Sequence, residues 1–374
     1  MLTRATREEQ EHRDRTVTMT TTLTGTGICT VSPPEPVGDR GGRVLGFVVR
    51  RVVSGLLVLL VTSVSIFTLF FYGPADPALA YCPEMHCSPD RLERVRHSLH
   101  LDDPVEQQYA DYMKGIFVGR DFQAGAITIK CSAPCLGVSF KLRVDVASLL
   151  WSRFPATLSI ALGGAALFLA FGVGLGVLAA RSRGTPVDKL IVGGALVVNA
   201  MPFYLLALLA WLLLISQWGL FPESGYHSPF HDGPLAWVKG LLLAWLVLGV
   251  TFATDYARFS RGSMVEALNE DFVRTARAKG LSERRTVLRH ALRAALVPVV
   301  TIFGLDLAEL LGGTVFLERI FDIQGIGITA LDALGTKDLP IISATILIAA
   351  FLIVVANVLV DVVYSLLDPR VRLY

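Results

Sequence analysis

The sequence predicts an all-α polytopic membrane protein with six transmembrane helices. Of its 374 residues, 53% are hydrophobic and 18% are charged, whereas about 25% of residues are charged in average soluble proteins. Four stretches lack Asp, Glu, Lys and Arg: residues 52–75, 154–180, 190–222 and 339–360. Each exceeds the roughly 20 residues that cross a bilayer as a helix. They are the predicted spans one, two, three and six.

Two further apolar runs contain a few charges and complete the six helices. Leu235–Thr254 is interrupted only by Lys239, near one end, where a lysine side chain reaches the membrane interface. Ala294–Leu317 contains Asp306 and Glu309. These runs are the predicted spans four and five.

The basic residues are sorted between alternate loops. The 34 Lys and Arg nearly balance the 32 Asp and Glu, which argues against a nucleic-acid partner, because such a partner calls for a clustered basic face. Basic residues precede span one and follow spans two and six, at Arg43, Arg50, Arg51, Arg181, Arg183, Lys189, Arg370 and Arg372. Because short loops rich in Lys and Arg stay in the cytoplasm, both termini are predicted to be cytoplasmic. The loop 216–234 has neither residue and is predicted to lie outside.

Residues 1–43 are predicted to be a disordered cytoplasmic tail, followed by transmembrane helix 1 within residues 44–75. Ten threonines occur by position 30, and no apolar period is present that would offset the entropy of ordering. A docking arm is the alternative interpretation. Met19, as well as Met1, fits the start of translation.

Residues 76–153 are predicted to form a small extracytoplasmic subdomain with helices over Asp90–Ser98 and Val105–Phe117. Its four cysteines are Cys82, Cys87, Cys131 and Cys135. Thiols outside the cytoplasm tend to oxidise, and four of them allow three pairings. Local bridges, Cys82 with Cys87 and Cys131 with Cys135, are the simplest interpretation. A metal site with His86 and four free thiols are the alternatives.

Residues 154–367 form the predicted core with helices 2–6, and its loop 255–293 has a helical pattern. The loop contains nine Lys or Arg and five Asp or Glu. One helix is expected over Ser260–Lys279, Gly280 supplies a left-handed stop, and Ser282 caps a second helix. Since the apolar positions are too few for a separate core, this elbow is expected to lie against something else. A solvated basic loop that only sets topology is the alternative.

Four polar residues at membrane depth are candidates for a translocation path: Asp306, Glu309, Asn199 and Asn357. Asp306 and Glu309 are three residues apart and therefore share a helix face. Acids in a span face a cavity or a partner. A pore lining that meets the positive amino end of a peptide is one interpretation, and hydrogen bonding between spans is the other.

Three segments in and just after the loop 255–293 carry a resemblance. They are Arg274-Thr275-Ala276-Arg277-Ala278-Lys279-Gly280-Leu281, Arg289-His290-Ala291-Leu292 and Leu296-Val297-Pro298. These segments resemble the cytoplasmic loop of binding-protein-dependent ABC importer permeases, and more narrowly the first (B-type) permease of the dipeptide/oligopeptide branch. The resemblance covers nearly the whole chain from Val44. It departs at Gln324, where the family usually has proline before Gly325-Ile326-Gly327.

The resemblance implies a type I ABC importer permease fold and a non-catalytic, pore-forming subunit in the bacterial cell membrane. The substrate class is di- or oligopeptides or similar small solutes. The implied partners are a second permease of the same family, one or two ATP-binding subunits that hold ATP and Mg, an extracytoplasmic substrate-binding protein and membrane lipid. The residues implied to couple to the ATPase are Glu270, Asp271, Val273, Arg274, Thr275, Ala276, Arg277, Ala278, Lys279 and Gly280.

Motifs that are missing from the sequence argue against an enzyme, and one other class of transporter remains as an alternative. The chain has no Gly-x-x-x-x-Gly-Lys-Ser/Thr loop for ATP phosphates, so no cofactor is expected in it and the energy source is expected in a partner. It also lacks the zinc and nucleophile motifs of hydrolases, and no metal site residues are assigned. The remaining alternative is a stand-alone, proton-coupled secondary transporter that uses Asp306 and Glu309.

Overall fold

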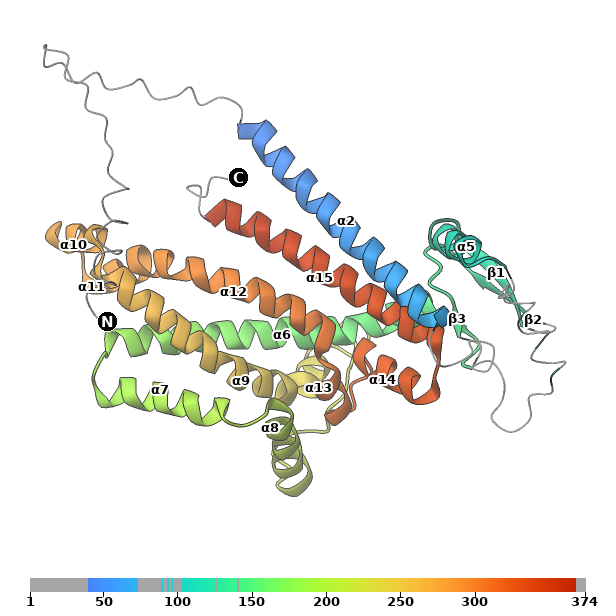
Figure 1. Ribbon diagram of the computed structural model, residues 1–374. Coiled ribbons are helices and arrows are strands. Elements are labelled where there is room, and N and C mark those ends of the chain that lie inside the picture. Colours follow the sequence, from blue (N-terminus) through green and yellow to red (C-terminus); the bar gives the residue numbers. More distant parts are fainter. Residues whose placement is uncertain are drawn as a thin grey trace, which may run out of the picture. The chain divides into compact units, whose positions relative to one another are not determined.

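The computed structural model describes residues 40–72, 89, 93, 96, 103–124, 127–139 and 141–367, and these are mainly helical (Figure 1). Residues 1–39 of the predicted tail, the C-terminal residues 368–374 and the positions of Cys82, His86 and Cys87 lie outside the described residues. The last four residues predicted for the tail, 40–43, are instead the start of a helix. The same holds for most of the helix predicted over 90–98, of which Glu93 and Arg96 are described, both in helical conformation.

Five helical segments in the described part of the chain are long and apolar enough to cross a membrane. Four are the helices α2 (Arg40–Tyr72), α6 (Val146–Arg181), α9 (Pro234–Asn269) and α15 (Leu339–Leu367). The fifth runs through α11 (Glu283–Arg285), the π-helix η2 (Thr286–Ala291) and α12 (Leu292–Gly313). They match the predicted spans one, two, four, five and six.

The predicted third span is broken in the structure. Instead of one helix over 190–222, the chain forms α7 (Pro186–Asn199), then α8 (Phe203–Ala210) and the π-helix η1 (Trp211–Gln217), with a bend of 93° between the two parts. Pro202 explains the break, because proline lacks an N–H and disfavours helical geometry at the residue before it. Counted as one bent span, this pair brings the total to six.

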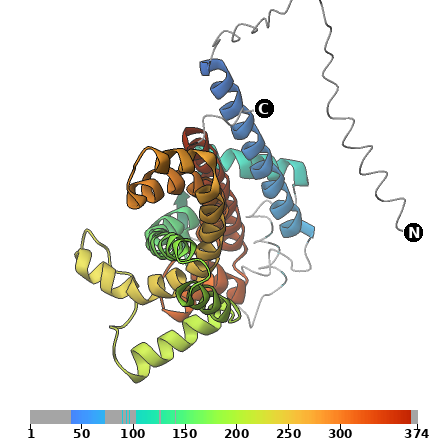
Figure 2. The same cartoon turned by 90° about the vertical axis from the view of Figure 1, so that its left-hand side faces the viewer.

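The core of the bundle lies between α6 and α9, which run side by side (Figure 1). Figure 2 looks nearly along α6 and shows the other helices around it. Glycines on α6 allow the close approach: a Cβ at Gly176 would lie 2.5 Å from the Cβ of Ser260 and 2.7 Å from the carbonyl oxygen of Ala257. Gly172 is a packing position for the same reason, because a Cβ there would overlap the Cβ of Tyr256.

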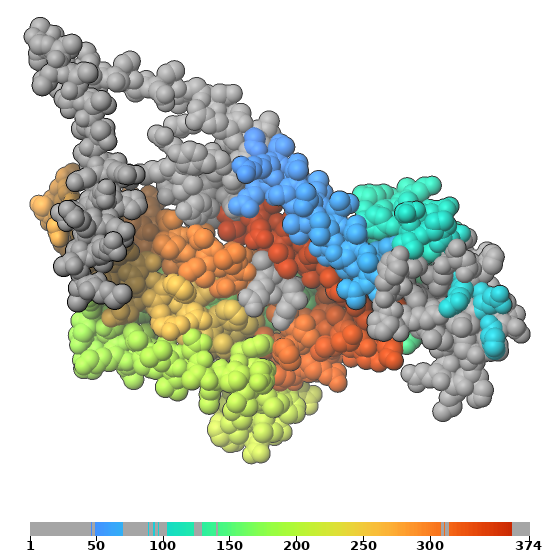
Figure 3. All heavy atoms as spheres, viewed as in Figure 1, coloured from blue at the N-terminus to red at the C-terminus, as the bar shows by residue number. Residues whose placement is uncertain are grey.

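Helix α2 lies along α15 (Figure 3). A Cβ at Gly55 would meet the side chain of Val354 at 2.5 Å, so a small residue is required there. Most other apolar side chains of α2 are exposed, including Leu56 and Leu57 at 61% and 60%. An apolar helix face without protein cover suits contact with lipid.

The described part of residues 76–153 contains the helix predicted over Val105–Phe117 and also strands that were not predicted. Helix α5 (Val105–Val118) precedes two antiparallel pairs, β1 (Arg120–Ala124) with β2 (Ile127–Cys131), and β3 (Val138–Ser139) with β4 (Val144–Asp145). In the first pair Arg120 lies opposite Cys131 and Ala124 opposite Ile127. Buried Ser139 donates a hydrogen bond of 2.5 Å to Asp338, which ties this segment to the turn before α15.

Cys131 and Cys135 form a disulfide with an S–S distance of 2.01 Å, which is the predicted local pairing. Cys135 is fully buried, together with Val138 and Cys131. In the chain-entropy account, so short a closed loop contributes about 2 kcal/mol to stability. The bridge links the end of β2 to the segment that precedes β3.

We expect this disulfide to be detectable in the membrane-embedded protein. Trypsin cleavage after Lys130 and Lys141 releases one peptide that contains both cysteines. Under non-reducing conditions its mass should be lower by the hydrogens that oxidation removes, and reduction should restore them. Alkylation of both thiols without prior reduction would contradict the pairing.

Candidate functional site

The elbow between α9 and α12 begins with a break at Glu270. The prediction of one continuous helix over Ser260–Lys279 is wrong, because α9 ends at Asn269 and a separate helix α10 (Asp271–Ala278) follows. Glu270 is extended, with φ −68° and ψ 150°, and serves as the N-cap of α10. The Asn269 side chain donates to the carbonyl of Val265, a local bond that competes with helix continuation. The chain therefore turns before Gly280 as well as at it.

Gly280 ends α10 in the left-handed conformation, with φ +75°, as predicted. Its N–H donates to the carbonyl of Arg277 at 2.9 Å, and the N–H of Leu281 donates to the carbonyl of Ala276 at 3.3 Å. These two bonds form a Schellman motif, the usual helix stop at glycine. Ser282 occupies the predicted N-cap position of α11, but its side chain makes no capping bond.

An ion pair closes the turn on both sides of Gly280. The guanidinium of Arg277 donates two bonds to Glu283, Nε to Oε2 at 3.1 Å and Nη2 to Oε1 at 2.8 Å. The bond to Glu283 raises the pKa of Arg277. Both side chains are about half exposed, at 43% and 54%, so the pair adds little stability. Its bidentate geometry fixes the direction in which the chain leaves α10.

The inner face of α10 packs on the bundle of the same chain. Val273 is fully buried and Ala276 is 6% exposed. They belong to a cluster with Ala180 of α6, Met264 of α9 and Val287 of η2. The elbow was expected to lie against another surface, and on its inner side that surface is formed by the ends of spans of the same chain. Any displacement of α10 acts directly on α6, α9 and η2.

The outer face of the elbow is exposed. The exposed residues among the predicted coupling positions are Glu270, Asp271, Arg274, Thr275, Arg277, Ala278, Lys279 and Gly280. Phe272 adds an apolar side chain that is 43% exposed. The pair between Asp271 and Arg274, 3.3 Å apart, leaves both side chains largely in solvent. The face thus combines basic groups with one aromatic ring, and it suits a protein partner.

Asp306, a predicted translocation residue, is hydrogen-bonded within the bundle. Tyr256 of α9 donates to its Oδ2 at 2.7 Å, and Tyr256 packs on Phe168 with ring centroids 4.8 Å apart. Of the two interpretations of the acids, a pore lining or hydrogen bonding between spans, this contact is an example of the second. Glu309 lies in α12, but its side chain is outside the described part of the structure.

The two predicted asparagines lie on different helices. Asn199, at the end of α7, is exposed and donates to Asp255 of α9 at 3.0 Å. Asp255 also accepts from Arg258 of the same helix at 2.5 Å. Asn357 is partly exposed on α15. The structure therefore connects Asn199 to α9 rather than to Asn357.

A fully buried carboxylate that the sequence analysis did not single out lies at the other end of α12. Glu318 of α13 (Val315–Ile320) accepts hydrogen bonds from Thr157 of α6 at 2.7 Å, from Thr314 at 2.9 Å and from the N–H of Ile328 at 2.8 Å. Thr157 in turn accepts from the N–H of Ile326 at 2.9 Å. Glu318 thus caps α14 (Ile326–Thr336) from outside its own sequence.

The capping arrangement explains the Gly325-Ile326-Gly327 segment noted in the sequence. A Cβ at Gly325 would overlap the Glu318 carboxyl group, and one at Gly327 would lie 3.0 Å from Oε2 of Glu318. Both glycines therefore make room for the carboxylate. A cavity of about 130 Å³ adjoins the group and is lined on its far side by α15, including Thr345.

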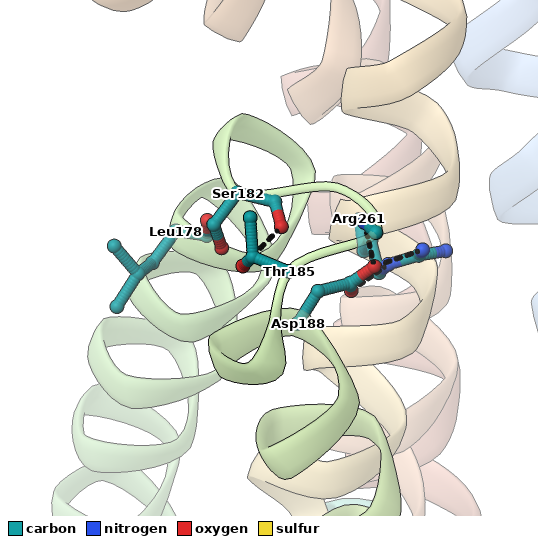
Figure 4. Close-up of polar contacts among 6 residues, drawn as sticks. Leu178, Ser182, Thr185, Asp188 and Arg261 are labelled. Atoms are coloured by element: carbon teal, nitrogen blue, oxygen red, sulfur yellow. Dashed lines mark hydrogen bonds and ion pairs between the residues drawn. The ribbon is translucent and has the colours of Figure 1, made fainter.

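A second polar contact that the sequence analysis missed joins α7 to α9 near the elbow. Asp188 accepts from Nε and Nη2 of Arg261 at 2.6 and 2.8 Å, and from the N–H of Gly184 at 2.9 Å. Figure 4 shows the pair beside the α6–α7 turn, where Thr185 donates to the carbonyl of Ser182. Residues 73 positions apart meet here, so spacing along the sequence gave no signal of the contact.

Comparisons with known proteins agree on one family. Residues 172–373 match the family described as binding-protein-dependent transport system inner membrane component, and residues 44–161 match its N-terminal family. A putative peptide transport system permease protein of Brucella abortus is 36% identical over 325 residues, which are 87% of this chain and 98% of that protein. The dipeptide transport system permease protein DppB of Escherichia coli is 34% identical over 352 residues, with 88% and 99% covered.

A third relative and one solved structure complete the comparison. The di/tripeptide transport system permease protein DppB of Pseudomonas aeruginosa is 35% identical over 349 residues, with 88% of this chain and 99% of that protein covered. The inward-facing MetNI methionine ABC transporter, in its CY5 native crystal form, has a chain that is 17% identical. That chain gives a TM-score of 0.48, with 59% of this chain and 97% of that one covered.

Proposed function

The chain belongs to the family of binding-protein-dependent transport system inner membrane components, and from this premise we propose that it is the pore-forming permease of an ATP-driven importer of di- or oligopeptides. Membership makes it a multi-pass permease of the inner membrane. The peptide substrate is proposed because the relatives are named as peptide, dipeptide and di/tripeptide permeases. Its spans would form half of the pore and a second permease the other half.

The two-sided elbow is the observation that carries the proposal. Buried Val273 and Ala276 attach α10 to the ends of three helices, while its outer face presents Arg274 and Lys279 to a partner. A short helix held this way passes a push from an ATPase subunit to the spans as a rigid-body movement. The Schellman turn at Gly280 keeps its direction constant.

The proposed assembly has four kinds of component. ATP and Mg would be held by one or two ATP-binding subunits at the elbow, on the cytoplasmic side together with both termini. A substrate-binding protein would dock on the opposite side, near residues 76–153. This orientation follows from the basic loops and is supported by the exposed basic face of α10.

A stand-alone proton-coupled transporter is not supported. Family membership places the chain in a multi-component transport system. The acid that a proton relay needs, Asp306, is engaged by the hydroxyl of Tyr256. A relay through it would also leave the helical elbow without a role.

Uptake into proteoliposomes tests the proposal. The chain, its partner permease and the ATP-binding subunits are reconstituted with the substrate-binding protein, and accumulation of a radiolabelled dipeptide is measured. We expect accumulation that requires ATP on the side of the ATP-binding subunits and is unchanged by a protonophore. Uptake that follows an imposed pH gradient without ATP would contradict the proposal.

A further inference from the structure

Helix α7 is bound to α9 by polar contacts at both of its ends. At its start Asp188 pairs with Arg261, and at its end Asn199 bonds to Asp255 (Figure 4 shows the first contact). The two contact points on α9 are six residues apart, from position 255 to position 261. The broken third span is therefore fastened to the helix that leads into the elbow.

The contact at the start of α7 is the stronger of the two. The Asp188 side chain is only 7% exposed and that of Arg261 is 30% exposed. The carboxylate accepts three bonds of 2.6 to 2.9 Å, and the third, from Gly184, comes from a turn residue with φ +81°. A bidentate and shielded pair is costly to break, because removal of one partner leaves the other charge without its counterpart.

The pair of Asp188 and Arg261 lies close to the elbow. Arg261 lies on the last turns of α9, which ends at Asn269 just before α10. One residue earlier, Ser260 packs against Gly176, so α6 meets α9 at the same level. The corner between α6 and α7 is thereby attached to α9 close to the point where α10 would be pushed.

Helix α8 turns out of the line of α7 beyond the break at Pro202 (Figures 1 and 2), and it packs on the core by apolar side chains, with Ala207 fully buried. A movement of α9 acts on α7 through the two polar contacts, whereas α8 meets the core by apolar packing and is joined to α7 at a bend of 93°. The backbone between Asn199 and Phe203 is the point at which the two parts of the span can change their angle.

We infer that Asp188 and Arg261 are positioning residues for energy coupling, which hold α7 to α9 so that the movement of α10 is passed to the third span. The inference deepens the proposed function and depends on it. The pair touches neither substrate nor nucleotide. It acts by making α7 and α9 move as one body, and its loss lets α9 follow the ATPase subunits without α7.

A double-mutant cycle tests the inference in the reconstituted importer described above. The variants are Asp188→Asn, Arg261→Gln and the double variant, and Lys189→Gln is the matched control that removes the exposed neighbouring charge. Three quantities are measured: co-purification with the ATP-binding subunits, the ATP hydrolysis rate, and dipeptide accumulated per ATP hydrolysed. A merely structural role would lower the first two together with transport.

We expect each single variant to assemble and hydrolyse ATP while accumulating roughly tenfold less dipeptide per ATP, in the range of measured coupling changes. The double variant should be no worse than the more damaged single one, because both changes break the same pair. Lys189→Gln should match the wild type. If the single variants fail to insert, Arg261→Lys, which keeps the charge but loses the bidentate bond, should show a partial loss of the ratio.

The outcomes separate the inference from the proposed function. Wild-type protein without ATP-dependent uptake refutes the proposed function. Wild-type protein with such uptake, beside variants with an unchanged ratio of dipeptide to ATP, refutes the role of the pair alone. Losses in the double variant that equal the product of the single losses show independent residues and also overturn the inference.

Discussion

Replacing Gly280 by leucine is expected to leave the chain in the membrane and to abolish ATP-driven uptake. Gly280 has φ +75°, a conformation that costs an L-residue about 1–2 kcal/mol. A Cβ there meets no atom of this chain within 4 Å, so folding of the spans is spared. The added side chain instead projects from the turn toward the surface where the ATP-binding subunit is proposed to dock. Dipeptide uptake and ATP hydrolysis in proteoliposomes measure the effect.

A glycine elsewhere in the same region provides the control. Gly262 is exposed on α9, also has open space around its Cβ position, and lies within a regular helix. Gly262→Ala should leave uptake unchanged and favour the helix by up to about 1 kcal/mol. Gly280→Asn should retain more coupling than Gly280→Leu, because asparagine tolerates the left-handed region. Wild-type uptake by Gly280→Leu would overturn the assignment of the elbow.

Of the two turns in the elbow, only the one at Gly280 could be predicted from the local sequence. The stop at Gly280 was predictable because a glycine after a helical run marks a left-handed cap. The break at Glu270 was not, because glutamate is a good helix former and nothing in its type indicates an extended backbone. The break follows from packing: α10 must turn so that Val273 and Ala276 reach the ends of α6, α9 and η2.

The polar residues of the spans were only partly interpretable from the sequence. Apolar length placed five spans and missed the break in the third. It gave no indication of the partners of Asp306 and Asp188, which lie 50 and 73 residues away. Such pairings depend on which helix faces meet, and a single sequence does not determine that. Arg261 carried no signal because the positive-inside rule already explains a basic residue in a cytoplasmic loop, and Asp188 lies among such basic residues, beside Lys189.

Replacing Glu318 by alanine is expected to destabilise the fold more than any other single change considered for the bundle. The carboxylate accepts bonds from Thr157, Thr314 and the N–H of Ile328, all at 2.9 Å or less. Hydrogen bonds to a charged group contribute about 1.5–3 kcal/mol each, and unsatisfied buried donors add a desolvation cost. Since alanine also enlarges the adjoining cavity of about 130 Å³, we expect a loss of about 3 kcal/mol or more.

The apparent melting temperature of the purified protein in detergent measures this loss. Glu318→Gln keeps the shape and one acceptor oxygen, so its melting temperature should lie between those of the alanine variant and the wild type. Glu223→Ala, at an exposed position, should melt like the wild type. Because the same carboxylate joins α6 to the start of α14, the alanine variant should also lose uptake in proportion to folded protein. A wild-type melting temperature for Glu318→Ala would show that α14 is held by its apolar contacts instead.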